Sequence, residues 1–172
     1  VTTLHGTDIT LVGLEPSFLP LVKLSIEASD GVTAVSRFLK EKTLTNYSID
    51  KDIEVIHNFI DTELFKPACN EQFKEHIAPE GEKILIHTSN FRAVKRVGDT
   101  IKILEKVKKE IPAKLIHIGD GPDRSECERL TRELKLEKDV VFLGKQDGLE
   151  NLLSVADIFL MPSQSESFGL SA

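Results

Sequence analysis

Short apolar runs rich in β-branched residues alternate with amphipathic stretches of helical length along almost the whole chain. Such runs predict buried strands, and apolar residues at three- and four-residue steps predict helices with one packed face. The expected strands cover residues 1–5, 32–35, 54–57, 83–89, 113–118, 140–143 and 157–161, and the expected helices cover residues 18–28, 37–46, 97–110, 123–134 and 149–155. Strands that alternate with helices need right-handed crossovers, so we expect an α/β fold whose parallel sheets are covered on both faces.

The boundary between two such α/β units is expected near residues 58–61, where the pattern gives way to a polar stretch at 68–82. Polar, turn-rich segments of this kind commonly connect domains. Residues 1–57 would then form the carboxyl-terminal part of one domain and residues 58–172 most of a second. The chain opens inside a strand-like run and stops in a loop pattern, so we expect it to be an excerpt from a longer protein.

Charge limits the partners that this chain can bind. The formal net charge is -6, which argues against a general affinity for nucleic acid or for an anionic membrane. Apolar residues make up 40% of the chain, which is enough for a folded core. We therefore expect small-molecule partners bound by local clusters of cations. The sequence is compatible with a homo-oligomer but does not fix the oligomeric state.

The two cysteines, Cys69 and Cys127, lie far apart in sequence and lack the spacing of metal ligands. We expect two free thiols, which fits a reducing cytoplasm. No apolar run approaches the roughly 18 residues that a membrane-spanning helix needs, and no signal peptide is visible. A cytoplasmic location is therefore expected.

A basic segment, Ser-Asn-Phe-Arg-Ala-Val-Lys-Arg at residues 89–96, joins an expected strand to an expected helix. Three of its last five residues are cations: Arg92, Lys95 and Arg96. A helix N-terminus has unpaired N–H groups and a positive dipole end, so cations placed there suit an anion such as a diphosphate. The alternative is a solvated basic patch.

Two further strand ends carry glycine. Gly119 and Gly121 allow the backbone to approach a ligand or to turn sharply, and a plain tight turn is at least as good an interpretation. In the segment 143–147, backbone groups near Gly144 are placed to recognise the edge of a nucleobase. The side chain of Asp147 is better interpreted as a helix N-cap.

Near the end of the chain, the sequence Ser-Glu-Ser-Phe-Gly-Leu at residues 165–170 comes after the expected strand at 157–161. The carboxylate of Glu166 would lie at the mouth of a parallel strand, followed by a turn of small residues with free N–H groups. This arrangement suits a sugar hydroxyl beside a phosphate.

His5 ends the first expected strand, where it could hydrogen-bond a substrate hydroxyl or serve a structural role.

The sequence has no Cys/His metal cluster, no Gly-x-Ser-x-Gly elbow and no Walker-type loop. Gly-x-Gly-x-x-Gly is also absent, which removes the main support for a dinucleotide dehydrogenase.

Taken together, these turns resemble the family-4 retaining glycosyltransferases of the GT-B fold, in which two Rossmann-like domains enclose a sugar nucleotide. Residues 165–170 are similar to the first half of that family's Glu-x7-Glu motif, with Glu166 at the first glutamate. The second glutamate would fall beyond the end of the chain. In the family's Gly-Arg-Leu-x-x-x-Lys-Gly turn, Lys95 matches the lysine, Asn90 stands at the arginine and Arg96 stands at the second glycine.

A closer similarity is to the branch of this family that transfers N-acetylglucosamine from UDP to L-malate in bacillithiol biosynthesis. Five segments carry it in order: residues 2–8, 32–36, 58–61, 89–96 and 143–147. The resemblance covers essentially the whole chain. It implies a retaining glycosyltransferase whose substrates are UDP-N-acetylglucosamine (UDP-GlcNAc) and L-malate.

The resemblance also implies roles for single residues. Lys95, helped by Arg92 or Arg96, would stabilise the UDP leaving group, and Glu166 and His5 would contact the transferred sugar. The expected site residues are His5, Lys95 and Glu166 for catalysis, and Asn90, Arg92, Arg96, Gly119, Gly144, Phe168, Gly169 and Leu170 for nucleotide-sugar binding. No metal cofactor is expected, and residues 58–61 are the hinge candidate for domain closure.

Three alternatives remain at this point. The first is a glycosyltransferase of the same fold with another acceptor, such as inositol phosphate, a lipid or a polysaccharide. The second is a UDP-N-acetylglucosamine 2-epimerase, which should lack the loop at residues 165–170. The third is a doubly wound module that binds a nucleotide without catalysis.

Overall fold

The computed structural model describes residues 1–10, 12–67, 71–166 and 168–171, with only the backbone at Thr7 and Asp8. The chain divides into two compact units. The first unit comprises Val1–Phe59 and Glu166–Leu170, and the second comprises Ile60–Ser165 and Ser171–Ala172. Each unit has its own parallel sheet and its own core, so each is described separately.

The first unit has a three-stranded parallel sheet in the order β1-β2-β3. Its strands are β1 (Thr2–Leu4), β2 (Val32–Ala34) and β3 (Glu54–Val55), and its helices are α1 (Thr7–Thr10), η1 (Val12–Leu14), α2 (Leu19–Ala28) and α3 (Arg37–Tyr47). Leu4, Ile26 and Leu39 are fully buried in its core. The Ser36 side chain accepts a hydrogen bond from the Leu39 N–H and so caps α3.

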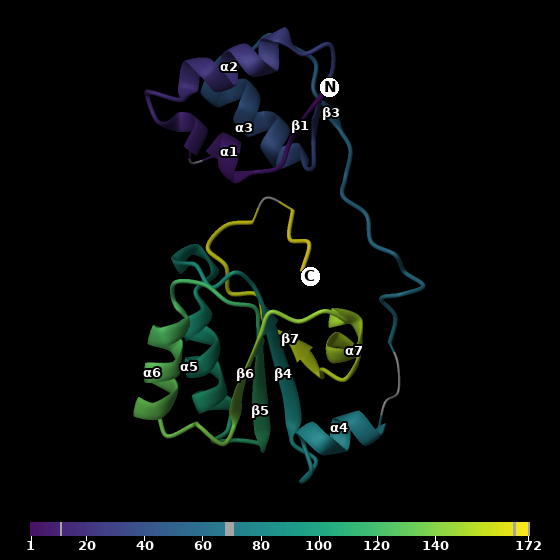
Figure 1. Ribbon diagram of the computed structural model, residues 1–172, viewed down its shortest axis with the longest axis vertical. Helices are drawn as coiled ribbons and strands as arrows, with labels where there is room; N and C mark the ends of the chain where they lie inside the picture. The colour runs from purple at the N-terminus through teal and green to yellow at the C-terminus, as the bar shows by residue number, and fades with distance from the viewer. Residues whose placement is uncertain (11, 68–70, 167, 172) are drawn as a thin grey trace. The chain divides into compact units, whose positions relative to one another are not determined.

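The second unit has a four-stranded parallel sheet in the order β6-β5-β4-β7. Its strands are β4 (Lys83–Thr88), β5 (Ala113–Ile118), β6 (Val140–Gly144) and β7 (Ile158–Phe159), and its helices are α4 (Glu71–Ile77), η2 (Ala93–Lys95), α5 (Val97–Val107), α6 (Arg124–Glu133) and α7 (Leu149–Ser154). Figure 1 shows α5 and α6 on one face of this sheet and α4 and α7 on the other. The predicted α/β class and parallel pairing are confirmed.

Alternation along the strands divides the core of the second unit between the two faces. Leu85 and Leu115 pack with α5 and α6, whereas Ile84, Ile86 and Ile116 pack with α4 and α7. Both faces are buried, which is why the strands are nearly continuous apolar runs in the sequence.

The strand order reverses between β4 and β7. From β4 the chain passes through α5 to β5 on one side, whereas β7 is reached through α7, which covers the opposite face. In open α/β sheets the two connections diverge at such a point and leave a crevice outside the carboxyl ends of the strands. Residues 89–96 after β4 and residues 160–165 after β7 both start at this edge of the sheet.

Helix α4 was not predicted, because residues 68–82 were interpreted only as a polar connecting segment. The structure places a helix at Glu71–Ile77 within it. Phe73 and Ile77 pack onto the core that contains Ile84 and Ile86. Two apolar side chains at a four-residue step are enough for this contact but give a weak periodic signal in the sequence.

Cys127 is buried and free, as expected, and burial raises the pKa of its thiol to about 11. The same expectation for Cys69 lies outside the described residues. None of the helices within the described ranges reaches the length and apolar character that a bilayer crossing requires.

His117 is a buried histidine in β5, on the face covered by α5. Its Nε2 lies 2.7 Å from the Thr100 hydroxyl oxygen, and that hydroxyl lies 2.6 Å from the Val97 carbonyl oxygen, to which it donates. His117 Nε2 therefore carries the proton. Among the described residues, no partner is found for its Nδ1. Burial, with a smaller contribution from His87, lowers the pKa of His117 to about 3.

This low pKa predicts a pH-dependent stability. In the unfolded chain His117 becomes protonated as the pH falls below about 6.5, whereas in the folded chain it stays neutral down to about pH 3. The free energy of unfolding therefore falls as the pH falls through this window. From this group alone we expect a loss of about 2 kcal/mol between pH 7 and pH 5. A His117→Leu variant should lose this part of the pH dependence. Protection of the β5 amides from hydrogen exchange in the full-length protein measures it, and an unchanged dependence in the variant would contradict the assignment.

Candidate active site

Residues 89–96, here called the basic turn, are anchored in the core by Phe91. Phe91 is fully buried although its backbone has a φ of 40°, in the left-handed region that large side chains avoid. Its ring centroid lies 5.6 Å from that of His117 and 6.4 Å from that of Phe142. The Phe91 carbonyl oxygen accepts a hydrogen bond of 3.0 Å from the Asp123 N–H. The buried ring therefore fixes a strained turn whose neighbouring residues are exposed.

The three cations of the basic turn have different surroundings. Arg92 is exposed and Lys95 is half-buried. Arg96 is bound by Asp99, with its Nε 2.7 Å and its Nη2 2.5 Å from the Asp99 Oδ2. The hydrogen bond from Arg96 is the main reason that the pKa of Asp99 is lowered. The charge of Arg96 is therefore compensated by the first turn of α5. Arg92 and Lys95 lie in the same turn, shortly after the end of β4.

The backbone conformation at Arg96 bears on the departure from the family's turn, in which glycine stands at this position. Its φ is 50° and it lies between η2 and α5. A left-handed backbone conformation costs a residue with a side chain about 1–2 kcal/mol, and glycine avoids that cost. The glycine of the resembling sequences suits the same backbone conformation, and here the ion pair to Asp99 offsets part of the strain.

Gly119 and Gly121 place the next loop directly against the basic turn. A Cβ atom on Gly119 would lie 1.8 Å from the Ser89 carbonyl oxygen, and one on Gly121 would lie 2.0 Å from the Asn90 carbonyl oxygen. Neither distance is compatible with a side chain. The two glycines are thus explained by close backbone contact between the two loops, a role beyond that of a plain turn.

The ends of β5 and β6 are also joined. The Gly119 N–H donates a hydrogen bond of 2.7 Å to the Gly144 carbonyl oxygen, and Gly144 has a φ of 70°.

The prediction that Asp147 caps the following helix is wrong. Gly148 occupies the N-cap position of α7 with a φ of 73° and without a side-chain cap. A left-handed φ favours glycine over aspartate, so the cap position moves by one residue.

The loop after β7, residues 160–165, approaches the basic turn as well. The Gln164 N–H donates a hydrogen bond of 2.8 Å to the Val94 carbonyl oxygen.

Two polar residues near this contact were not predicted as site residues: His87, which is buried, and Ser89, which is half-buried. The signal in the sequence was a histidine at the same place in two apolar runs, Ile-His-Thr and Ile-His-Ile.

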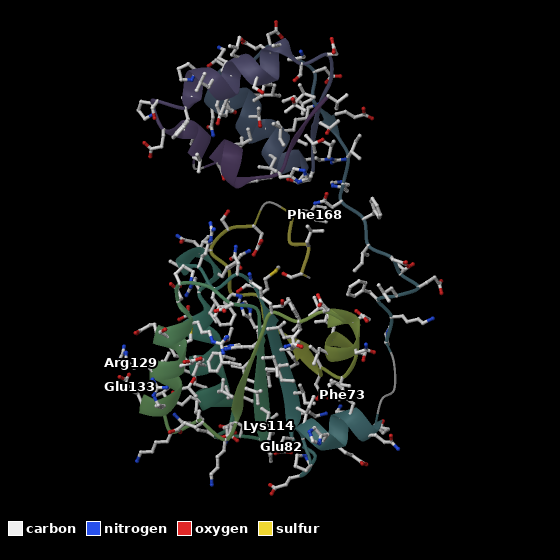
Figure 2. All side chains as sticks on the ribbon, viewed as in Figure 1. Phe73, Glu82, Lys114, Arg129, Glu133 and Phe168 are labelled. Atoms are coloured by element: carbon white, nitrogen blue, oxygen red, sulfur yellow. The ribbon has the colours of Figure 1, made fainter. Side chains whose placement is uncertain are left out.

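At the opposite, amino-terminal edge of the sheet, the charges are paired with one another. Figure 2 shows the Glu82 and Lys114 side chains beside each other, and the carboxylate and ammonium lie 3.3 Å apart. The Asp157 carboxylate lies 3.0 Å from the Lys83 ammonium and 3.3 Å from that of Lys74. Such pairs connect elements and leave little net charge for a ligand. The basic turn, with its three cations, lies at the other, carboxyl edge.

The structure brings several of the predicted site residues to one edge of the second sheet. These are Asn90, Arg92, Lys95, Arg96, Gly119 and Gly144. In the first unit, His5 is exposed directly after β1. Glu166, Phe168, Gly169 and Leu170 are grouped with the first unit, where the Phe168 ring centroid lies 5.8 Å from that of His57. Ser167 lies outside the described residues. Within the ranges that the structure describes, no cluster of His, Cys, Asp or Glu is arranged to hold a metal ion.

Comparison with protein families agrees with this fold. Residues 69–172 match the family described as Glycosyl transferases group 1, and residues 1–64 match the family described as Glycosyltransferase Family 4. The chain belongs to the glycosyl transferases group 1. The predicted family is confirmed.

Among curated proteins, the chain is 47% identical over 171 residues to the N-acetyl-alpha-D-glucosaminyl L-malate synthase of Bacillus anthracis, covering 99% of this chain and 45% of that protein. It is 30% identical over 187 residues to an uncharacterized glycosyltransferase of Methanocaldococcus jannaschii, covering 100% of this chain and 47% of that protein. The chain thus spans a little less than half the length of these relatives.

Among solved structures, Anabaena HepE in complex with UDP and glucose matches with a TM-score of 0.82 at 20% identity, over 96% of this chain and 46% of that one. The sucrose-phosphate synthase of Thermosynechococcus elongatus matches with a TM-score of 0.80 at 22% identity, over 99% of this chain and 46% of that one. These matches confirm the predicted GT-B architecture.

The glycine contacts give a matched pair of variants. Gly121→Ala should push the loop away from Asn90 and destabilise the second unit by about 1–3 kcal/mol, the usual cost of overpacking. Gly98→Ala is the control, because its Cβ would meet Leu130 at an ordinary 3.6 Å inside α5 and should stabilise by about 0.5–1 kcal/mol. Hydrogen exchange of the Asp123 amide, which donates to Phe91, reports the loop contact. Equal exchange in the two variants would disprove the role of Gly121.

Proposed function

We propose that this chain is part of a retaining glycosyltransferase that transfers N-acetylglucosamine from UDP-GlcNAc to L-malate, the first step of bacillithiol biosynthesis in the cytoplasm. The observation that carries the proposal is the position of the basic turn. Arg92 and Lys95 come after the end of β4, at the edge of the sheet where the strand order reverses, which is where open α/β sheets bind ligands. Similarity to the Bacillus anthracis synthase along almost the whole chain supports the choice of substrates.

The chemical difficulty of this reaction is the charge of the leaving group. As the bond between the anomeric carbon and the UDP oxygen breaks, negative charge grows on the diphosphate, and preorganised cations and N–H groups stabilise it best. Lys95 and Arg92 supply the cations in the proposal, and the backbone N–H groups of Phe168, Gly169 and Leu170 supply further donors. These groups take the place of a metal ion. Asn90, Gly119 and Gly144 contribute to the nucleotide contacts.

The acceptor side completes the bond changes. The malate hydroxyl oxygen bonds to the anomeric carbon on the face that UDP leaves, and its proton passes to the departing phosphate oxygen. Glu166 holds hydroxyl groups of the transferred sugar, and His5 contacts the same sugar near its reacting face. Residues 58–61 act as the hinge between the domains.

The central test is release of UDP from UDP-GlcNAc by the full-length protein, with and without L-malate and in the presence of EDTA. We expect release that depends on malate, persists with EDTA and falls at least about 100-fold in a Glu166→Ala variant, as for loss of a charged contact to the transition state. Release that needs another acceptor would remove malate from the proposal. Binding of UDP without release for any acceptor would favour a non-catalytic module.

The two arginines of the basic turn should differ in their effect on UDP binding. Arg92→Ala is expected to raise the Kd for UDP about tenfold or more, because a charge-assisted contact to phosphate is lost. Arg96→Gly should change the Kd by less than about threefold, since Arg96 is already paired with Asp99 and glycine suits its φ of 50°. Isothermal titration of the full-length variants with UDP measures both. The opposite ranking would assign the diphosphate contact to Arg96.

A further inference from the structure

His87 connects the basic turn with the loop after β7. It is a residue of β4 with only 1% of its surface exposed. Its Nδ1 lies 2.8 Å from the carbonyl oxygen of Leu160, the first residue of the loop after β7. Its Nε2 lies 2.8 Å from the hydroxyl oxygen of Ser89, the first residue of the basic turn. One imidazole ring therefore touches both loops at their starting points.

The chemistry of the partners fixes the direction of these hydrogen bonds. A carbonyl oxygen can only accept, so Nδ1 of His87 carries the proton and donates to Leu160. In the neutral ring Nε2 then accepts from the Ser89 hydroxyl. The Ser89 oxygen in turn accepts from the Phe91 N–H at 3.3 Å. These hydrogen bonds form a continuous chain from Leu160, in the loop after β7, to Phe91, the strained residue that anchors the basic turn.

A second contact closes the same pair of segments further along. The Gln164 N–H donates to the Val94 carbonyl oxygen at 2.8 Å. Strand β7 itself pairs with β4 through only two residue pairs, Leu85 with Ile158 and Ile86 with Phe159. With so short a pairing, the path of residues 160–164 depends on the contacts made beyond the strand, and His87 provides the first of the side-chain contacts.

A polar ring at this place is not needed for packing. The neighbouring rings are Phe91 and His117, with centroids 6.3 Å and 5.8 Å from that of His87, and an apolar side chain would be buried there without desolvating two nitrogens. Fully satisfied buried polar groups add little stability but select one arrangement of the groups that they join. The contacts of His87 select the arrangement of the two loops.

We propose that His87 is a positioning residue, which holds the loop after β7 against the basic turn so that the cations and the segment leading to Glu166 meet a nucleotide sugar in a fixed arrangement. The proposal rests on the proposed transferase function. His87 itself touches no substrate in this role and acts through Leu160 and Ser89.

The test compares His87→Leu with His117→Leu in the full-length protein. Both changes remove a buried histidine from the same register of adjacent strands, but the hydrogen bond of His117 goes to Thr100 in α5, and its ring meets the basic turn only by packing against Phe91. We expect His87→Leu, which removes both buried hydrogen bonds, to speed hydrogen exchange of the Gln164 amide about tenfold or more and to lower kcat/KM for UDP-GlcNAc by at least a similar factor. His117→Leu should change each by less than about threefold.

His87→Asn provides the rescue, because its side-chain amide can still donate to the Leu160 carbonyl oxygen. It should restore protection of Gln164 and most of kcat/KM, whereas Ser89→Ala, which removes the other hydrogen bond, should lower kcat/KM without a loss of the fold. These two variants also test the proposal if His87→Leu does not fold. Unchanged exchange of Gln164 in His87→Leu and Ser89→Ala, or equal losses of activity in His87→Leu and His117→Leu, would overturn it. Faster Gln164 exchange in a protein without transferase activity would instead remove the proposed function and leave the loop contact standing.

Discussion

Parallel pairing of β4 with β5 on one side and β7 on the other is the constraint on which the second unit depends. β4 and β5 pair over their full length from Lys83 with Ala113 to Thr88 with Ile118, and the much shorter β7 pairs on the opposite edge of β4. Parallel strands all end at the same edge, so their carboxyl-terminal loops are all brought to one place. The connecting helices diverge to opposite faces, which leaves that place open to a ligand.

The basic turn is rigid because several neighbours hold its backbone. Phe91 anchors it in the core, Gly119 and Gly121 pack against Ser89 and Asn90, and Gln164 binds its far end. Preorganised donors stabilise growing charge better than mobile ones, since they need no reorganisation during the reaction. The same rigidity explains why strained residues are tolerated here: the surrounding contacts over-determine their conformation. For a transferase whose leaving group is a diphosphate, this is the physical basis of the proposed site.

His87 and His117 occupy equivalent positions in adjacent strands and nevertheless have different physical roles. Both nitrogens of His87 have partners, which lie on the two loops. His117 has a partner for Nε2, and burial lowers its pKa. In the sequence the two are indistinguishable, because each is a histidine inside an apolar run. The difference arises from the neighbouring loops, since the Ser89 hydroxyl and the Leu160 carbonyl group reach only the ring of His87.

The sequence by itself determined most of the secondary structure and the class of fold. Strand and helix periodicity is local, so the strand at Ala113–Ile118 was predicted to the residue, and the resemblance carried by residues 89–96 and 165–170 gave the family. Tertiary structure decided the rest. Helix α4, the pairing of Arg96 with Asp99 and the contact that Gly121 makes all depend on backbone conformation or on segments brought together from a distance. Periodicity carries no information about such contacts, because they are set by how the sheet assembles its loops.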